Sequence, residues 1–90
     1  MTRDRAEVIA LNALAFLAES PEKLQPFLNE TGLMPAHLSE RAGDSDLHVS
    51  LLDWLLNNES LLLVFATGNA IAPDDVMRAR HLLVNDGVSL

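Results

Sequence analysis

The sequence predicts an all-α fold: a single compact domain of about six helices, arranged as two similar three-helix units. The first observation behind this prediction is a repeat, in which large apolar residues recur 38 positions apart in one ungapped register. The second is that prolines begin apolar helical patterns and glycines end them. The third is the absence of long alternating runs of β-branched residues, which argues against a sheet. The repeated pairs are Leu14 and Leu52, Phe16 and Trp54, Leu17 and Leu55, Leu24 and Leu62, Phe27 and Phe65, Leu33 and Ile71, Pro35 and Pro73, and Leu38 and Val76.

The first three helices are predicted over residues 4–19, 21–31 and 35–42. Ser20 is a suitable N-cap for the second helix, and Pro21 follows it at the first helical position, where a missing amide hydrogen does no harm. Pro26 lies inside the same helix, where a lost hydrogen bond costs about 3 kcal/mol. We therefore expect a kink or a restart at Pro26.

The last three helices are predicted over residues 45–57, 59–67 and 73–84. Asp44 is the expected N-cap of the first of them. Pro73 begins the sixth helix as Pro35 begins the third, and apolar residues flank both prolines at the spacing of a hydrophobic staple. All four glycines stand where apolar patterns end, so we expect a left-handed conformation at Gly32, Gly43, Gly68 and Gly87.

These elements define one domain over residues 1–84, with units of about 4–42 and 45–84 and a flexible tail over 85–90. Neither unit can cover its own apolar face, so we expect the two to pack together about an approximate two-fold axis. An internal duplication is the simplest origin of such a pattern.

Composition excludes several classes of function. The 90 residues include no cysteine, which rules out disulfides and fits a reducing compartment. The formal net charge of −7 disfavours binding to nucleic acids and to anionic membranes, because phosphates are repelled. No stretch approaches the roughly 20 apolar residues of a membrane span. The basic and apolar start resembles a secretion signal, but residues 10–19 have a repeat partner within the fold, so we expect a cytoplasmic protein.

The two units differ most in their middle helices. Leu61, Leu63 and Val64 in the fifth helix replace Lys23, Gln25 and Pro26 in the second, which makes the fifth helix apolar nearly all round. One interpretation is that this helix is central and covered on several sides. The other is that the three side chains form an exposed patch for a partner or a second copy of the chain.

Acidic residues are concentrated between Ala42 and Met77, where lysine and arginine are absent. Most of these acids, Glu59 included, stand in predicted first turns, where a negative charge favours the helix dipole. Asp53 is not explained in this way, because it lies mid-helix beside Trp54. Trp54 itself is expected in the core, since its repeat partner is Phe16.

No catalytic or metal-binding constellation emerges. His37, His48 and His81 fall on three different helices, and we interpret them as surface or capping residues rather than ligands. The sequence predicts no cofactor and no enzyme activity. A helix-turn-helix formed by the last two helices is disfavoured, because the link from Gly68 to Ala72 is long and acids begin the second element.

Four segments carry a resemblance when they are taken together: Ala13-Leu14-Ala15-Phe16-Leu17-Ala18, Phe27-Leu28-x-x-Thr31-Gly32-Leu33, Leu52-Asp53-Trp54-Leu55-Leu56-x-x-Glu59 and Pro73-x-x-Val76. They resemble a family of short helical proteins from alphaproteobacteria that is catalogued as a domain of unknown function. The resemblance covers nearly the whole chain except the tail, implies a small bacterial cytosolic protein, and brings no established activity or site. It places Asp53 and Glu59 slightly above the other acids as candidates for a role.

The sequence thus favours a non-enzymatic protein–protein interaction module, with a homodimer as one form of it. Leu61, Leu63 and Val64 are the candidate contacts, and Asp53 and Glu59 are the candidate polar rim. The alternative is a small-ligand-binding or accessory subunit with a pocket between the units near Trp54. A regulator that contacts nucleic acid ranks third.

Overall fold

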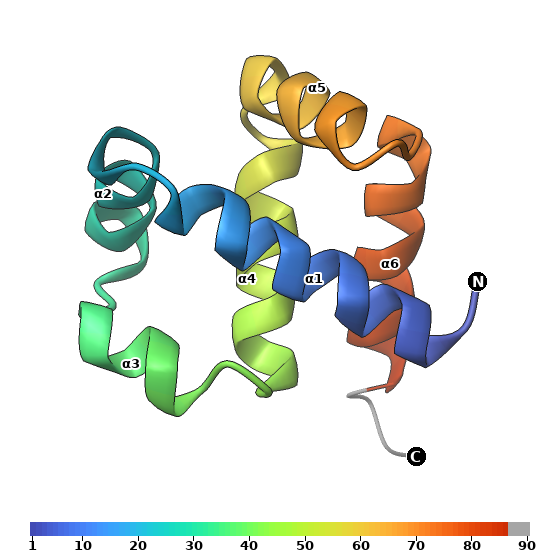
Figure 1. Ribbon diagram of the computed structural model, residues 1–90. Coiled ribbons are helices and arrows are strands. Elements are labelled where there is room, and N and C mark those ends of the chain that lie inside the picture. The colour runs from blue at the N-terminus through green and yellow to red at the C-terminus, as the bar shows by residue number, and fades with distance from the viewer. Residues whose placement is uncertain (87–90) are drawn as a thin grey trace.

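Six α-helices follow one another through short links (Figure 1). The computed structural model describes residues 1–86, and this part of the chain contains no strand, so the predicted all-α class is confirmed. Of the expected tail, Asn85 and Asp86 belong to the last helix, and residues 87–90 lie outside the described residues. The helices are α1 (Arg3–Ala18), α2 (Pro21–Thr31), α3 (Pro35–Glu40), α4 (Ser45–Leu56), α5 (Glu59–Gly68) and α6 (Pro73–Asp86).

The helix starts follow the predicted caps. Ser20 Oγ accepts a hydrogen bond from the Glu22 amide at 3.2 Å, and Asp44 Oδ1 accepts one from the Asp46 amide at 3.1 Å. Each bond satisfies an amide that the helix itself leaves without an acceptor.

The expected restart at Pro26 is absent, because α2 continues through it from Pro21 to Thr31. Phe27 and Leu28, which directly follow the proline, are both buried in the core. Their burial holds this turn of the helix in place and offsets the hydrogen bond that Pro26 cannot donate.

Three helices form the centre of the molecule. α1 crosses α4, and α6 packs against both of them (Figure 1). α5 turns away from α4 by 111° and lies across one end of α4 and α6. Aromatic rings join the two halves of the chain: the ring centroids of Phe16 and Phe65 are 5.5 Å apart, and those of Phe27 and Trp54 are 6.0 Å apart.

Several features agree with the repeat register. Pro21 and Glu59 begin equivalent helices, as do Pro35 and Pro73. The third residue of α3 and the third residue of α6 also make equivalent capping hydrogen bonds. His37 Nδ1 accepts the Met34 amide at 3.0 Å, and Asp75 Oδ2 accepts the Ala72 amide at 3.1 Å. Equivalent positions are buried on both sides, as for Phe27 and Phe65. The internal duplication and its two-fold axis remain predictions that these features support.

The backbone φ angles correct the expectation that glycines take the left-handed conformation at the helix ends. Gly32 has a φ of 73° and ends α2 as predicted. Gly68, in contrast, is the last residue of α5, and the left-handed conformation falls on Ala70, whose φ is 55°. The prediction is also wrong for Gly43, which has no positive φ, and Gly87 lies outside the described residues. Ala70 is the repeat partner of Gly32, so the repeat would have located this turn where the glycine rule did not.

The last helices of the two units differ in length and in packing. α6 has 14 residues and lies against α1, α4 and α5, whereas α3 has 6 residues and lies to one side of α1 (Figure 1). Of the residues of α3, only Leu38 is buried. The second unit is therefore closed by a long helix, whereas the first unit is closed by a helix of less than two turns.

Among residues 1–86, no single helix has both the length and the apolar character needed to cross a membrane. α4 and α5 meet that test only when taken together, across the sharp bend between them.

Candidate interaction surface

The outer face of α5 carries the exposed apolar residues that the sequence suggested. Leu63 and Val64 are 49% and 58% exposed, whereas Leu62, Phe65 and Ala66 are buried on the inner face. α5 is thus a peripheral helix, and the interpretation that it is central and covered on several sides is wrong. Other helices already fill the centre of the domain, because α1, α4 and α6 pack directly together.

Glu59 belongs to this outer face. It stands four residues before Leu63, which is one helical turn, and both side chains are exposed. Ser60 and Thr67 are likewise exposed and flank the apolar pair at the same helical spacing. The result is an apolar centre with a polar margin on one side of α5, and we call Glu59, Ser60, Leu63, Val64 and Thr67 the α5 face.

Leu61 and Asp53 do not share that face. Leu61 is half-buried and packs against the core. Asp53 lies on α4, and its carboxylate accepts a hydrogen bond from the Arg80 guanidinium of α6. The acid that the helix dipole could not explain therefore forms an ion pair between two helices. Sequence reasoning missed Arg80, since 27 residues separate the partners.

Trp54 is in the core, as predicted, and is only 6% exposed. Trp54 borders an open depression of about 240 Å³ between α2 and α4, together with Glu30, Ser50 and Asn57. The indole Nε1 is buried and has no hydrogen-bond partner within the described residues. The alternative of a ligand pocket near Trp54 stays a prediction.

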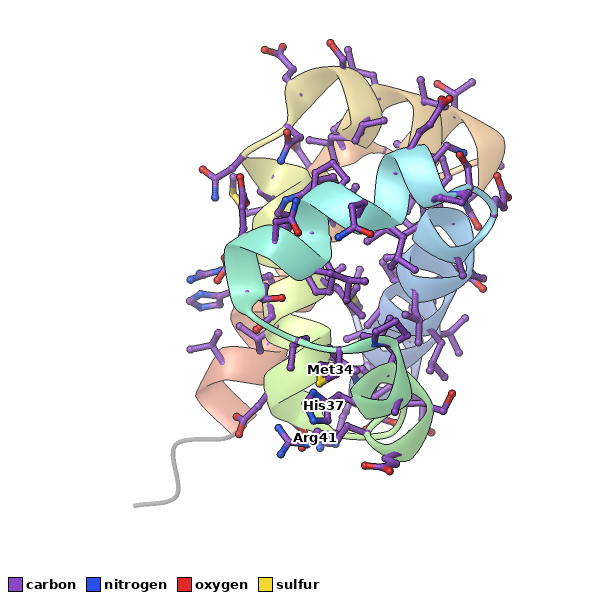
Figure 2. The ribbon with its side chains drawn as sticks, turned by 90° about the vertical axis from the view of Figure 1, so that its left-hand side faces the viewer. Met34, His37 and Arg41 are labelled. Atoms are coloured by element: carbon purple, nitrogen blue, oxygen red, sulfur yellow. The ribbon has the colours of Figure 1, made fainter. Side chains whose placement is uncertain are left out.

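His37 has the capping role that the sequence suggested. Its ring lies beside Met34 and Arg41 at the end of the molecule formed by α3 (Figure 2). Nδ1 accepts the Met34 amide, and the His37 carbonyl accepts the Arg41 amide at 2.9 Å. This imidazole is engaged in holding the short helix and is not a free ligand.

His48 contradicts the surface interpretation, because it is buried at 2% exposure. Its Nε2 lies 2.6 Å from the Ala42 carbonyl oxygen, and since a carbonyl only accepts, Nε2 carries the hydrogen. The repeat could have predicted this burial, because Ala10, the repeat partner of His48, lies on the core-facing side of its helix. His48 thus anchors the α3–α4 link to α4.

Within the described residues, no group of three or more histidine or acidic side chains is arranged to hold a metal ion.

Comparison with known proteins adds a family to this geometry. Residues 3–86 match the model of a family described as proteins of unknown function, DUF3572. The chain belongs to this family. The match covers all six helices, so the DUF3572 domain is the whole described fold and not a part of it. The predicted resemblance to a family of unknown function is thereby confirmed.

Other comparisons return nothing for this DUF3572 member: no curated protein matches it, and no solved structure matches it. Its candidate surfaces therefore rest on its own residues. Of the five residues that the sequence singled out, the structure brings Glu59, Leu63 and Val64 together on α5 and separates Asp53 and Leu61 from them.

Proposed function

We propose that the protein is a non-enzymatic protein–protein interaction module of the bacterial cytoplasm, and that it pairs with a second copy of itself through the α5 face. The exposed pair Leu63 and Val64 carries the proposal. The proposed alphaproteobacterial origin rests on the sequence resemblance alone, and the proposed absence of catalysis rests on the lack of catalytic motifs in the sequence.

Only about half of each side chain is still exposed, so covering Leu63 and Val64 is worth about 0.7–1.5 kcal/mol each, which is a useful centre for an interface. A two-fold dimer places the same patch of both copies in contact, so the apolar pair of one copy meets the apolar pair of the other. Glu59, one turn away, would then lie at the solvated margin, where an acid is tolerated.

Analytical ultracentrifugation over a range of concentrations tests this proposal. The wild-type chain is expected to dimerise, and Leu63→Glu or Val64→Glu is expected to yield monomers, because a carboxylate would be buried at the centre of the interface. Thermal unfolding of each monomeric variant should remain cooperative, since both positions are exposed in the single chain.

Gln25→Glu is the matched control. Gln25 is exposed and is the repeat partner of Leu63, so the variant adds the same charge to the equivalent helix of the other unit. It should leave the dimer unchanged. A wild-type chain that remains monomeric, or a dimer that Leu63→Glu and Gln25→Glu weaken equally, would contradict the proposal.

A further inference from the structure

An apolar groove lies between α1, α2 and α3, on a different part of the molecule from the α5 face. Its volume is about 420 Å³. It is lined by Leu14 and Ala18 of α1, by Leu24 of α2, and by Leu38 and Ser39 of α3. Leu14 and Leu24 are only half-buried, so this groove leaves core side chains partly uncovered.

The second unit carries larger residues at several positions that correspond to the groove. Small residues stand at three of the groove's positions, Ala18, Ser39 and Ala42, and their repeat partners in the second unit are large. Those partners are Leu56, Met77 and Arg80.

The counterparts of the groove's two half-buried leucines are covered. Leu52 and Leu62, which correspond to Leu14 and Leu24, are both buried, whereas Leu38 and its counterpart Val76 are buried alike. α6 packs along α4 and α5 at this place, whereas α3 ends at Glu40 and lies to one side of α1 (Figure 1). In this fold, the element that covers such a surface is a long amphipathic helix, and the first unit does not supply one.

Beside the groove, α1 carries a row of exposed apolar residues. Val8, Leu11, Ala15 and Ala18 share one side of the helix at 3.6 residues per turn, and all four are exposed. Val8 and Leu11 are 44% and 42% exposed. Leu14 adjoins this row and belongs to the groove. From Val8 to Ala18 the row is about 15 Å long, which is about three helical turns.

Acidic side chains lie at both ends of the row, beside Arg3 and Arg5 at its start and Lys23 at its end. Asp4 stands one turn before Val8, and Glu19 and Glu22 follow Ala18; all three are exposed. Lys23, the nearby base, is already engaged, since its Nζ is 3.0 Å from Glu19 and lies over the Phe16 ring. At least four of the six basic side chains are paired in this way with acids of the chain itself. The chain as a whole carries a net charge of −7, which favours a basic partner.

We propose that the groove between α1 and α3 binds an amphipathic helix of another protein, about three turns long, with an apolar stripe and basic residues near both ends of it. The stripe covers Leu11, Leu14 and Ala18, as α6 covers the equivalent surface of the second unit. The basic ends meet Asp4 and Glu22. This site is separate from the α5 face, and neither proposal depends on the other.

A designed peptide tests the groove directly. The probe is a fluorescein-labelled helix of leucine, alanine and lysine, about 15 residues long, with its leucines on one face and its lysines at the ends. Fluorescence anisotropy should show saturable binding to the wild-type chain. A peptide of the same composition in scrambled order should bind at least about tenfold more weakly, because it lacks an apolar stripe.

Two variants of the chain locate the binding site. Leu11→Lys removes an apolar contact and repels the basic probe, so it should weaken binding at least about tenfold. Ala18→Leu inserts the side chain that the second unit carries at this position, and it should weaken binding by filling the groove while the melting temperature does not fall. Circular dichroism would confirm that both variants are folded.

Leu63→Lys is the control for this experiment, because it makes the same change on the α5 face. It should leave peptide binding within about twofold of wild type, whatever it does to self-association. The proposal is overturned if the scrambled peptide binds as well as the designed one. It is also overturned if Leu63→Lys weakens binding as much as Leu11→Lys, or if neither variant weakens it.

Discussion

The two units, α1–α3 and α4–α6, begin their last helices alike and complete them differently. A proline begins both α3 and α6, and in each the third residue of the helix accepts the amide just before the proline. α6 then continues for 14 residues against α1 and α4, whereas α3 ends after 6. One helical start thus leads in the second unit to a closed core and in the first to an open groove. The difference shows that the length of the closing helix, rather than its start, decides how much of the core is covered.

The largest expected effect concerns what the units share. Phe27 and Phe65 are equivalent and fully buried, so Phe27→Ala and Phe65→Ala should each lower the free energy of unfolding by about 3–5 kcal/mol. Urea unfolding monitored by circular dichroism measures both. If the two losses of unfolding free energy differ by more than about 2 kcal/mol, the two positions are not packed equivalently.

A smaller effect should separate the closing helices. Leu83→Ala in α6 is expected to cost about 3–5 kcal/mol, because Leu83 is enclosed by a continuous core. Leu38→Ala in α3 should cost about 2 kcal/mol, since the groove beside it lets the site relax and already admits solvent. Equal losses in urea unfolding would mean that α3 is held as firmly as α6, and the comparison between them would fail.

The smallest effect has opposite signs in the two units. Gly32→Ala should destabilise the protein by about 1 kcal/mol: a side chain meets no neighbour there, but φ is 73°. Ala70→Gly should raise stability by up to about 1 kcal/mol, because it removes a side chain from a φ of 55°. Differential scanning calorimetry resolves both shifts in melting temperature. A loss of stability in Ala70→Gly would show that the glycine's greater freedom in the unfolded chain outweighs the relief.

Local features of the fold could be predicted from the sequence because neighbouring residues determine them. Pro21, Pro35 and Pro73 marked helix starts, and Ser20 and Asp44 marked caps, since each acts on amides within a few residues of itself. The aromatic core was equally predictable, because the repeat located its members twice.

Features that depend on distant residues could not be predicted in the same way. The ion pair between Asp53 and Arg80 requires the relative placement of α4 and α6, which no local pattern contains. The exposure of Leu63 depends likewise on which helices occupy the centre. An apolar helix predicts burial on several sides, and here the space was already taken by α1, α4 and α6.

The buried histidine has a practical consequence for anyone who engineers this chain. His48 donates to the Ala42 carbonyl from inside the core, so the segment that leads into α4 is tied to it at a fixed distance. Extra residues placed at Gly43 would pull that carbonyl away and leave an imidazole hydrogen without an acceptor, at a cost of about 1–3 kcal/mol. Affinity tags, reporter domains and new chain termini therefore belong elsewhere on the surface.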